Sequence, residues 1–79
     1  SLGIQTLASY TLAEAQIENL VTAKGYADCV AFMGEESISI VVSKDDGSDL
    51  TAEDVAKITD IAITETGYDA SGIKIVPAN

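Results

Sequence analysis

The sequence predicts an α+β domain in which two helices pack on one face of a three-stranded sheet, in the chain order α-β-β-α-β. Three observations predict it: two segments of helical periodicity that each end at a glycine, two adjacent strand-like runs between them, and a short β-branched run before the final proline. A chain of 79 residues is long enough for one domain and no more. Residues 11–79 are expected to form this domain, and residues 1–10 to be a lead-in or an extension of the first helix.

The first helix is expected to begin at Thr11. Thr11 and Glu14 have the spacing of a capping box, and Gly25 supplies the left-handed residue that commonly ends a helix. At 100° per residue, Glu14 and Glu18 fall outside the apolar stripe, so we expect both on the helix surface. The stripe itself contains Ala13, Ile17, Leu20, Val21 and the aliphatic stem of Lys24.

Residues 27–33 and 37–43 predict a β-hairpin, because both runs are rich in β-branched and small residues and a Gly-Glu-Glu turn separates them. The second run alternates, with Ile38, Ile40 and Val42 on one face and serines on the other. In the first run either Val30 and Phe32 or the alternate set can face the core. We expect Val30 and Phe32 inside because they bury more apolar area. The alternate set is Cys29, Ala31 and Met33.

A second helix is predicted from Thr51 to Thr66, because Thr51 and Asp54 form a capping-box pair and Gly67 follows the last helical residue. A short last strand is expected over residues 73–76, ended by a proline. The inward stripe of the helix is expected to contain Ala52, Val55, Ile58, Thr59, Ala62 and Thr66.

The acidic loop before this helix does not fit a calcium EF-hand. With Gly47 at the sixth position of such a loop, the first and third ligands would be Val42 and Lys44, which cannot coordinate calcium. We interpret Asp45 and Asp46 as turn formers, and the later acidic residues as partners of the positive end of the helix dipole. Weak calcium binding is the alternative interpretation.

Composition excludes several function classes. Thirteen acidic residues against four lysines give a net charge of −9, which disfavours nucleic acid, because phosphate contacts need a basic surface. The chain has one cysteine, Cys29, and no histidine, which excludes a thiol–imidazole pair, and Cys29 is interpreted as a small apolar residue. No acidic pair is set in an apolar segment that would raise a carboxyl pKa. We expect no catalytic residue, cofactor or metal.

Several apolar residues are expected outside the predicted core, which is either the scattered apolar surface normal for a folded protein or a contact surface. Ile61 and Ile63 lie on the two flanks of the second helix, and Val41 and Val76 point away from the face assigned to the core. These four residues are the predicted interface with a neighbouring subunit, in a head-to-tail contact that can close into a ring. The alternative is a small ligand- or cation-binding domain of ferredoxin-like topology, which needs an additional strand at residues 2–7.

Several segments together resemble the C-terminal domain of the stage III sporulation protein AH family. They are I-E-N-L-V-T-A-K-G-Y-A-D-C-V-A-F at 17–32, S-I-S-I-V-V at 37–42, L-T-A-E-D-V-A-K-I-T-D-I-A-I-T-E-T-G at 50–67 and I-K-I-V-P at 73–77. The A-K-G-Y segment with its following strand and the E-D-V-A-K-I helix are the most specific parts. The resemblance covers about residues 12 to 78 and depends on the order and spacing of the segments together.

The resemblance implies a ring-building domain, related in fold to inner-membrane ring proteins of type III secretion systems and flagellar basal bodies. It implies an anchor in the mother-cell membrane, through an N-terminal helix outside this chain, and a location between mother cell and forespore. The implied partner is a forespore-membrane protein with an endopeptidase-like domain, with which the family forms a channel or feeding tube. The resemblance implies no enzyme activity.

Overall fold

The computed structural model describes residues 2–78, and the side chains of residues 10–78. Helix α1 (Leu2–Ala23) precedes strands β1 (Tyr26–Met33) and β2 (Ile38–Lys44). Helix α2 (Ala52–Thr66), the 3-10 helix η1 (Ala70–Gly72) and strand β3 (Ile73–Pro77) follow. The predicted order α-β-β-α-β is confirmed.

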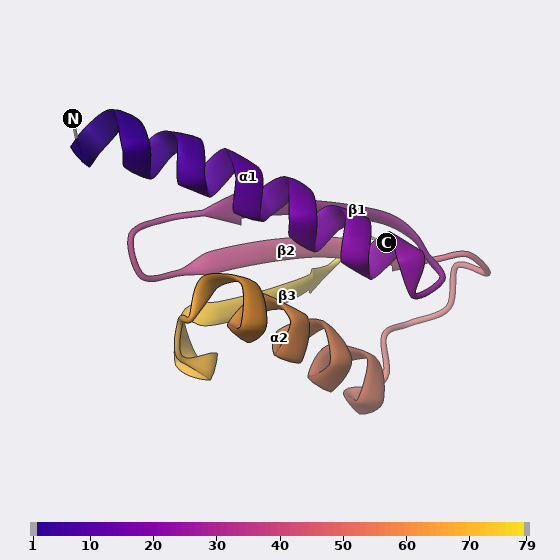
Figure 1. Cartoon of the computed structure of the whole chain (residues 1–79). Helices are drawn as coiled ribbons and strands as arrows, with labels where there is room; N and C mark the ends of the chain where they lie inside the picture. Colours follow the sequence, from indigo (N-terminus) through magenta and orange to yellow (C-terminus); the bar gives the residue numbers. More distant parts are fainter. Residues whose placement is uncertain (1, 79) are drawn as a thin grey trace.

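The two helices lie side by side on one face of the sheet, as predicted, and the first half of α1 extends beyond the strands (Figure 1). The strand order is β1-β2-β3, with β1 antiparallel and β3 parallel to the central strand. Helix α1 packs mainly on β1, and α2 packs on β3 and on α1. Because β3 is parallel to β2, the chain must cross over the sheet between them, and α2 forms this crossover.

The core lies between the helices and the central strand. Strand β2 contributes Ile38, Ile40 and Val42, which are all buried, so the predicted inner face of this strand is confirmed. Residues on the sheet-facing sides of both helices pack against this strand, and Tyr26 and Ala31 of β1 complete the cluster. The buried helix residues of the cluster are Ile17, Val21, Ile58 and Ala62.

Helix α2 begins and ends as predicted. The amide of Asp54 donates to the Thr51 hydroxyl oxygen at 3.1 Å, and the Thr51 amide donates to the Asp54 carboxylate at 2.9 Å, which completes a capping box. At the other end Gly67 is left-handed, with φ of 75°, and its amide donates to the Ile63 carbonyl. Local chemistry alone therefore defines both ends of this helix.

The expected start of the first helix is wrong. Helix α1 runs without interruption from Leu2, so Thr11 lies inside it and is not its cap. Residues 2–10 contain no proline, and the carboxylate expected to complete a capping box, Glu14, accepts instead from the amide of Met33. The segment at residues 2–7 is helical, so it does not form the additional strand that the ferredoxin-like alternative requires.

The expected inner face of the first strand is also wrong. Ala31 is only 4% exposed, whereas Val30 and Phe32 are 44% and 59% exposed. Ala31 lies opposite Ile40 in the sheet and therefore faces the helices. Because α1 crosses close over β1, the available space suits a small side chain, and the larger pair lies on the outer face. Burial area was a poor guide here because it ignores the distance between the two layers.

Two residues expected in the inward apolar stripes of the helices are exposed. Leu20 on α1 and Val55 on α2 are 42% and 38% exposed. On α2 the buried face is turned toward Asp54, whose carboxylate is held by groups from the sheet. Ala52, also expected to face inward, is exposed. The buried face of α2 therefore combines a polar contact at Asp54 with two residues of the predicted stripe, Ile58 and Ala62.

Candidate interaction surfaces

The sheet has one face that neither helix covers in residues 2–78. On this face Val30, Val41 and Val76 lie opposite one another on three adjacent strands, and Phe32 lies two residues further along β1. We call these four residues the open-face patch. Two of them, Val41 and Val76, are predicted interface residues, and the register makes them direct neighbours. The exposed pair on β1 enlarges the patch beyond the prediction.

Polar residues border the open-face patch. Ser39 lies between Phe32 on one side and Lys74 on the other, and Asp28 lies opposite Ser43 at the other end of the strands. The patch is therefore an apolar row with a polar rim, which is the usual arrangement of a protein–protein contact surface.

The second candidate surface is a flank of α2. Val55 and Ile63 are 38% and 36% exposed, and Thr59 lies between them at helical spacing, so the three form one stripe. We call this stripe the α2 flank. The remaining predicted interface residue, Ile61, lies on the opposite side of the helix and is partly buried against the core. The structure thus separates Ile61 from Ile63, as their positions in the sequence indicated.

The two outer edges of the sheet differ. At the β1 edge, the amides of Ala31 and Met33 donate to the carboxylates of Glu18 and Glu14, at 2.9 and 2.8 Å. The two glutamates, which were expected on the helix surface, are half-buried and accept hydrogen bonds from this edge. At the β3 edge, no side chain among residues 10–78 makes a comparable hydrogen bond to the strand.

A buried carboxylate, Asp54, joins the sheet to the start of α2. It accepts from the Tyr26 hydroxyl at 2.7 Å and from the Thr51 amide, and it pairs with the Lys44 ammonium at 2.9 Å. The Thr51 amide, followed by Tyr26 and Lys44, holds the pKa of Asp54 well below its usual range. Burial, and then the Asp54 carboxylate, raise the pKa of Tyr26 to about 12. Each group is satisfied by its neighbours, which is typical of a structural network.

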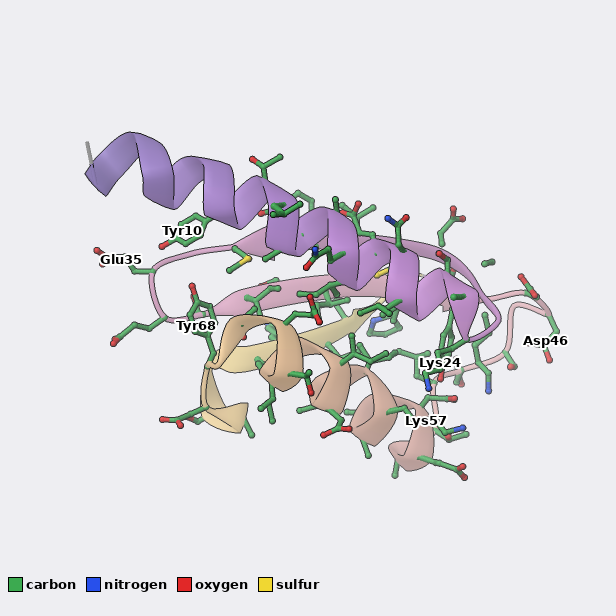
Figure 2. All side chains as sticks on the ribbon, in the orientation of Figure 1. Tyr10, Lys24, Glu35, Asp46, Lys57 and Tyr68 are labelled. Atoms are coloured by element: carbon green, nitrogen blue, oxygen red, sulfur yellow. The ribbon has the colours of Figure 1, made fainter. Side chains whose placement is uncertain are left out.

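A shallow hollow of about 290 Å³ lies beside this network, at the end of the molecule where α1 ends and α2 begins (Figure 2). Three of the four lysines line it, together with three aspartates, so opposite charges are balanced. A balanced lining gives little preference for a charged ligand. The charged residues concerned are Lys24, Lys44, Lys57, Asp45, Asp46 and Asp54.

The acidic loop folds on itself. Asp46 accepts from the amide and the hydroxyl of Ser48, at 3.0 and 2.6 Å, and these two bonds lower the pKa of Asp46. Gly47 is left-handed, with φ of 73°, and its amide donates to the Lys44 carbonyl. These contacts fit the interpretation of the loop as a turn. Among the residues that the structure describes, no three Asp, Glu or Cys side chains are grouped to hold a metal ion.

Cys29 is half-buried under α1. Burial, and then the carboxylate of Glu18, raise the pKa of the Cys29 thiol to about 11. A thiol with a raised pKa is protonated at neutral pH and is a weak nucleophile. Its environment is that of a small apolar residue beside the core.

Sequence reasoning missed the two glutamates and the exposed pair on β1. Their common cause is the position of α1, which lies directly over β1 and near its outer edge (Figure 2). Glu14 and Glu18 are one helical turn apart, and this spacing was visible in the sequence. The strand that their carboxylates would reach was not visible, because it depends on helix packing.

Neither helix of the described chain is sufficiently long and apolar to span a bilayer.

Comparisons with known proteins agree with this architecture. The fold is similar to that in the crystal structure of the type III secretion system protein EscJ from enteropathogenic E. coli, with a TM-score of 0.78 and 21% sequence identity. The alignment covers 92% of this chain and 48% of the EscJ chain, so this chain corresponds to about half of that protein. At this identity the likeness concerns the fold.

No curated protein matches the sequence. The family model described as SpoIIIAH-like protein matches residues 4–75, which is nearly the whole chain. The resemblance to the stage III sporulation protein AH family is thereby confirmed, and the chain belongs to the SpoIIIAH-like protein family.

Proposed function

We propose that this domain is a structural assembly module that forms a ring by head-to-tail self-association, as part of a channel between mother cell and forespore. Membership of the SpoIIIAH-like family and the fold shared with EscJ support an assembly role in sporulation. The observation that carries the proposal is the open-face patch, an apolar row across three strands that no helix of residues 2–78 covers.

The proposed ring contact places the open-face patch of one subunit against the α2 flank of the next. The helices cover one face of the sheet and the patch lies on the other, so the two surfaces point to different sides of the molecule. A contact between two different surfaces is heterologous, and repeated heterologous contacts close into a ring when the rotation permits. Val41, Val76 and Ile63 are the proposed central contacts. Ile61 lies on the opposite side of α2 against the core, so it would lie outside this contact.

The charge of the chain makes such an assembly sensitive to salt. With a net charge of −9, neighbouring subunits repel one another, and salt screens this repulsion over about 8 Å at physiological ionic strength. We therefore expect association to strengthen as the salt concentration rises. An interface held mainly by ion pairs would show the opposite dependence.

The test is a double substitution on the open face, Val41→Lys with Val76→Lys. Two ammonium groups in the apolar row would require desolvation on contact, so the variant is expected to lose self-association while it keeps cooperative unfolding. The matched control is Ala15→Lys with Thr64→Lys, which adds the same charge at exposed helix positions outside both surfaces. Analytical ultracentrifugation at several salt and protein concentrations measures association.

Two results would contradict the proposal. One is a wild-type chain that stays monomeric up to millimolar concentration at every salt concentration. The other is association that persists unchanged in the Val41→Lys, Val76→Lys variant, because the open-face patch would then not be the contact.

We further propose that the ring pairs with a forespore-membrane protein that bears an endopeptidase-like domain, and that the parent protein is anchored in the mother-cell membrane. The support is family membership together with a sheet whose β3 edge is available to a partner strand. The proposed role is mechanical and not enzymatic. Mixing the exported region of the parent with that partner and measuring the mass and stoichiometry of the complex tests it, and the absence of any complex would contradict it.

A further inference from the structure

Two glutamates on α1 occupy the places that a fourth strand would take beside β1. Glu14 accepts from the amide of Met33 at 2.8 Å, and Glu18 accepts from the amide of Ala31 at 2.9 Å. Both amides point away from β2, because they donate to α1 instead of to the neighbouring strand. The carboxylate oxygens therefore stand where the carbonyl oxygens of an adjacent strand would stand.

We propose that Glu14 and Glu18 close the β1 edge against pairing with other strands, so that this sheet adds a strand only at β3. The inference is independent of the proposed ring, because it concerns an edge of the sheet and not its open face. It assigns α1 a function in partner selection, in addition to covering the core.

The spacing of the two glutamates matches the spacing of the two amides. Four residues of helix rise about 6 Å, and two residues of strand span about 6.6 Å, so one helical turn is nearly commensurate with one strand repeat. The helix and strand run in opposite directions, since the earlier glutamate meets the later amide. A continuous helix can therefore place one acceptor on every outward amide of β1.

The next position of this pattern is not used. Thr22 lies four residues after Glu18, and Cys29 lies two residues before Ala31, so continuing the pattern would bring Thr22 opposite the Cys29 amide. The Thr22 hydroxyl donates to the carbonyls of Glu18 and Asn19, within its own helix. The closure is thus confined to the half of β1 nearer the hairpin.

Strand β1 is the kind of edge that needs protection. Of its eight residues only Asp28 carries a charge, and Val30 and Phe32 expose apolar surface beside the outward amides of Ala31 and Met33. Long apolar edge strands pair readily with other chains, and natural proteins block them with charged groups. Carboxylates are strong acceptors for amides, and they also repel an approaching acidic copy of this chain.

Strand β3 is limited by its backbone. The Ala78 amide donates to the Val42 carbonyl. Because successive backbone amides of a strand point to opposite sides, the Val76 amide points toward β2, and the backbone nitrogens of Ile75 and Pro77 point to the outer edge. Pro77 has no amide hydrogen, and the Ile73 amide donates to the Ala70 carbonyl. Within residues 73–77, Ile75 is the residue that directs its amide to the outer edge. The β3 edge can therefore pair only with a short strand, and no carboxylate among residues 10–78 blocks that pairing.

The experiment compares Glu14→Ala with Glu18→Ala against a matched loss of charge, Glu35→Ala with Glu36→Ala, at two exposed hairpin residues. The first pair is expected to speed amide exchange at Ala31 and Met33 by about tenfold or more, because each amide loses its acceptor. It is also expected to produce oligomers that pair through β1. The hairpin pair is expected to leave both properties unchanged. Exchange is measured by NMR, and mass by light scattering.

Two further variants separate reach from charge. Glu14→Asp with Glu18→Asp keeps the charge but shortens both side chains, so it is expected to open the edge. Glu14→Gln with Glu18→Gln keeps an acceptor of the same length without charge, so it is expected to keep the edge mostly closed. If the Glu14→Ala, Glu18→Ala variant does not fold, as judged by circular dichroism, the Glu14→Asp, Glu18→Asp variant is used for the test instead.

Three outcomes would overturn the proposal. The first is unchanged amide exchange at Ala31 and Met33 when the side chains at positions 14 and 18 are removed (alanine) or shortened (aspartate). The second is faster exchange without any new association, because the glutamates would then not exclude partners. The third is equal association of the hairpin pair, which would make net charge the cause. To keep edge pairing distinct from the proposed ring contact, all variants are repeated with Val41→Lys and Val76→Lys.

Discussion

The two edges of the sheet are protected by different means. The β1 edge is closed by side chains that reach from α1, whereas the β3 edge is limited by its own backbone, through a proline and a short length. A side-chain closure depends on where one helix packs, and it is lost when that helix moves or its acidic groups are replaced. A backbone limit persists in every state in which the strand exists. The comparison indicates that the β1 edge is the adjustable one.

The helices beside the two edges differ in the same way. Helix α1 has no acidic residue in its first turn and no basic residue in its last, and much of its contact with the sheet is to β1. Helix α2 has a complete capping box at one end and a left-handed glycine at the other. The β3 side of the molecule is therefore defined locally, and the β1 side is defined by tertiary contact. Four substitutions sharpen or break this contrast.

The largest effect is expected at the start of β3. A Cβ atom on Gly72 would overlap the carbonyl oxygen of Glu36, so Gly72→Val should displace β3 and destabilise the fold by about 3 kcal/mol. Urea unfolding measures the change, and Ser71→Val at the exposed neighbouring position is the control. A change below about 0.5 kcal/mol, the usual range for a surface substitution, would show that β3 tolerates displacement.

A smaller effect is expected from the capping box of α2. Thr51→Ala removes the hydroxyl that accepts from the Asp54 amide, and it should lower the free energy of unfolding by about 1 kcal/mol. Thr64→Ala, at an exposed position inside the same helix, should have little effect. Thermal unfolding compares the two variants. Equal losses would mean that the cap does not define this side of the molecule.

An effect confined to alkaline pH is expected from Tyr26, which connects β1 to α2. Its pKa rises from an ordinary value near 10 to about 12 in the folded protein, so the folded state holds this proton more strongly than the unfolded state. The resulting stability is present in full below pH 10 and is lost as the pH rises toward 12. Tyr26→Phe should reduce this loss, as measured by urea unfolding between pH 8 and 12.

Cys29 and Tyr68 also have raised pKa values, and each contributes stability with the same sign. Tyr68→Phe therefore serves as the control. The loss of stability at alkaline pH that is due to Tyr68 is measured in this variant and subtracted from the loss in the wild type. An identical pH profile for the wild type and Tyr26→Phe would contradict the assignment to Tyr26.

The smallest effect is expected from extending the closure of the β1 edge by one turn. Thr22→Glu should place a third carboxylate opposite the Cys29 amide and slow its hydrogen exchange a few-fold. Thr22→Ala, which supplies no acceptor, should not slow it. NMR measures the amide exchange rate of Cys29 in the two variants. Equal rates would mean that the match between helix turn and strand repeat ends at Glu18.

Sequence reasoning was most successful where the structure is local. The capping box at Thr51 and Asp54, the left-handed Gly67 and the alternation of β2 are each decided within a few residues, and all are confirmed. It was least successful along β1 and α1. There the inner face was assigned to Val30 and Phe32 by area, and α1 was given a start at a capping pair that the fold does not use.

The candidate surfaces follow the same division. Val41 and Val76 were identified from alternation and last-strand placement, but their contact depends on β3 pairing parallel to β2. The addition of Val30 and Phe32 to the open-face patch depends on α1 covering the other face of β1, where Ala31 is buried. No periodicity in β1 distinguishes its two faces, because both are apolar.

The amino-acid sequence by itself determined the fold class, the order of the elements, the ends of α2 and the family, because these depend on periodicity, caps and segment order along the chain. Tertiary structure alone decided which face of β1 is buried, which flank of α2 is free and which edge of the sheet is closed. The physical reason is distance: a carboxylate closes an edge only when helix packing brings it within hydrogen-bonding range of an amide 13 or 19 residues further along the chain.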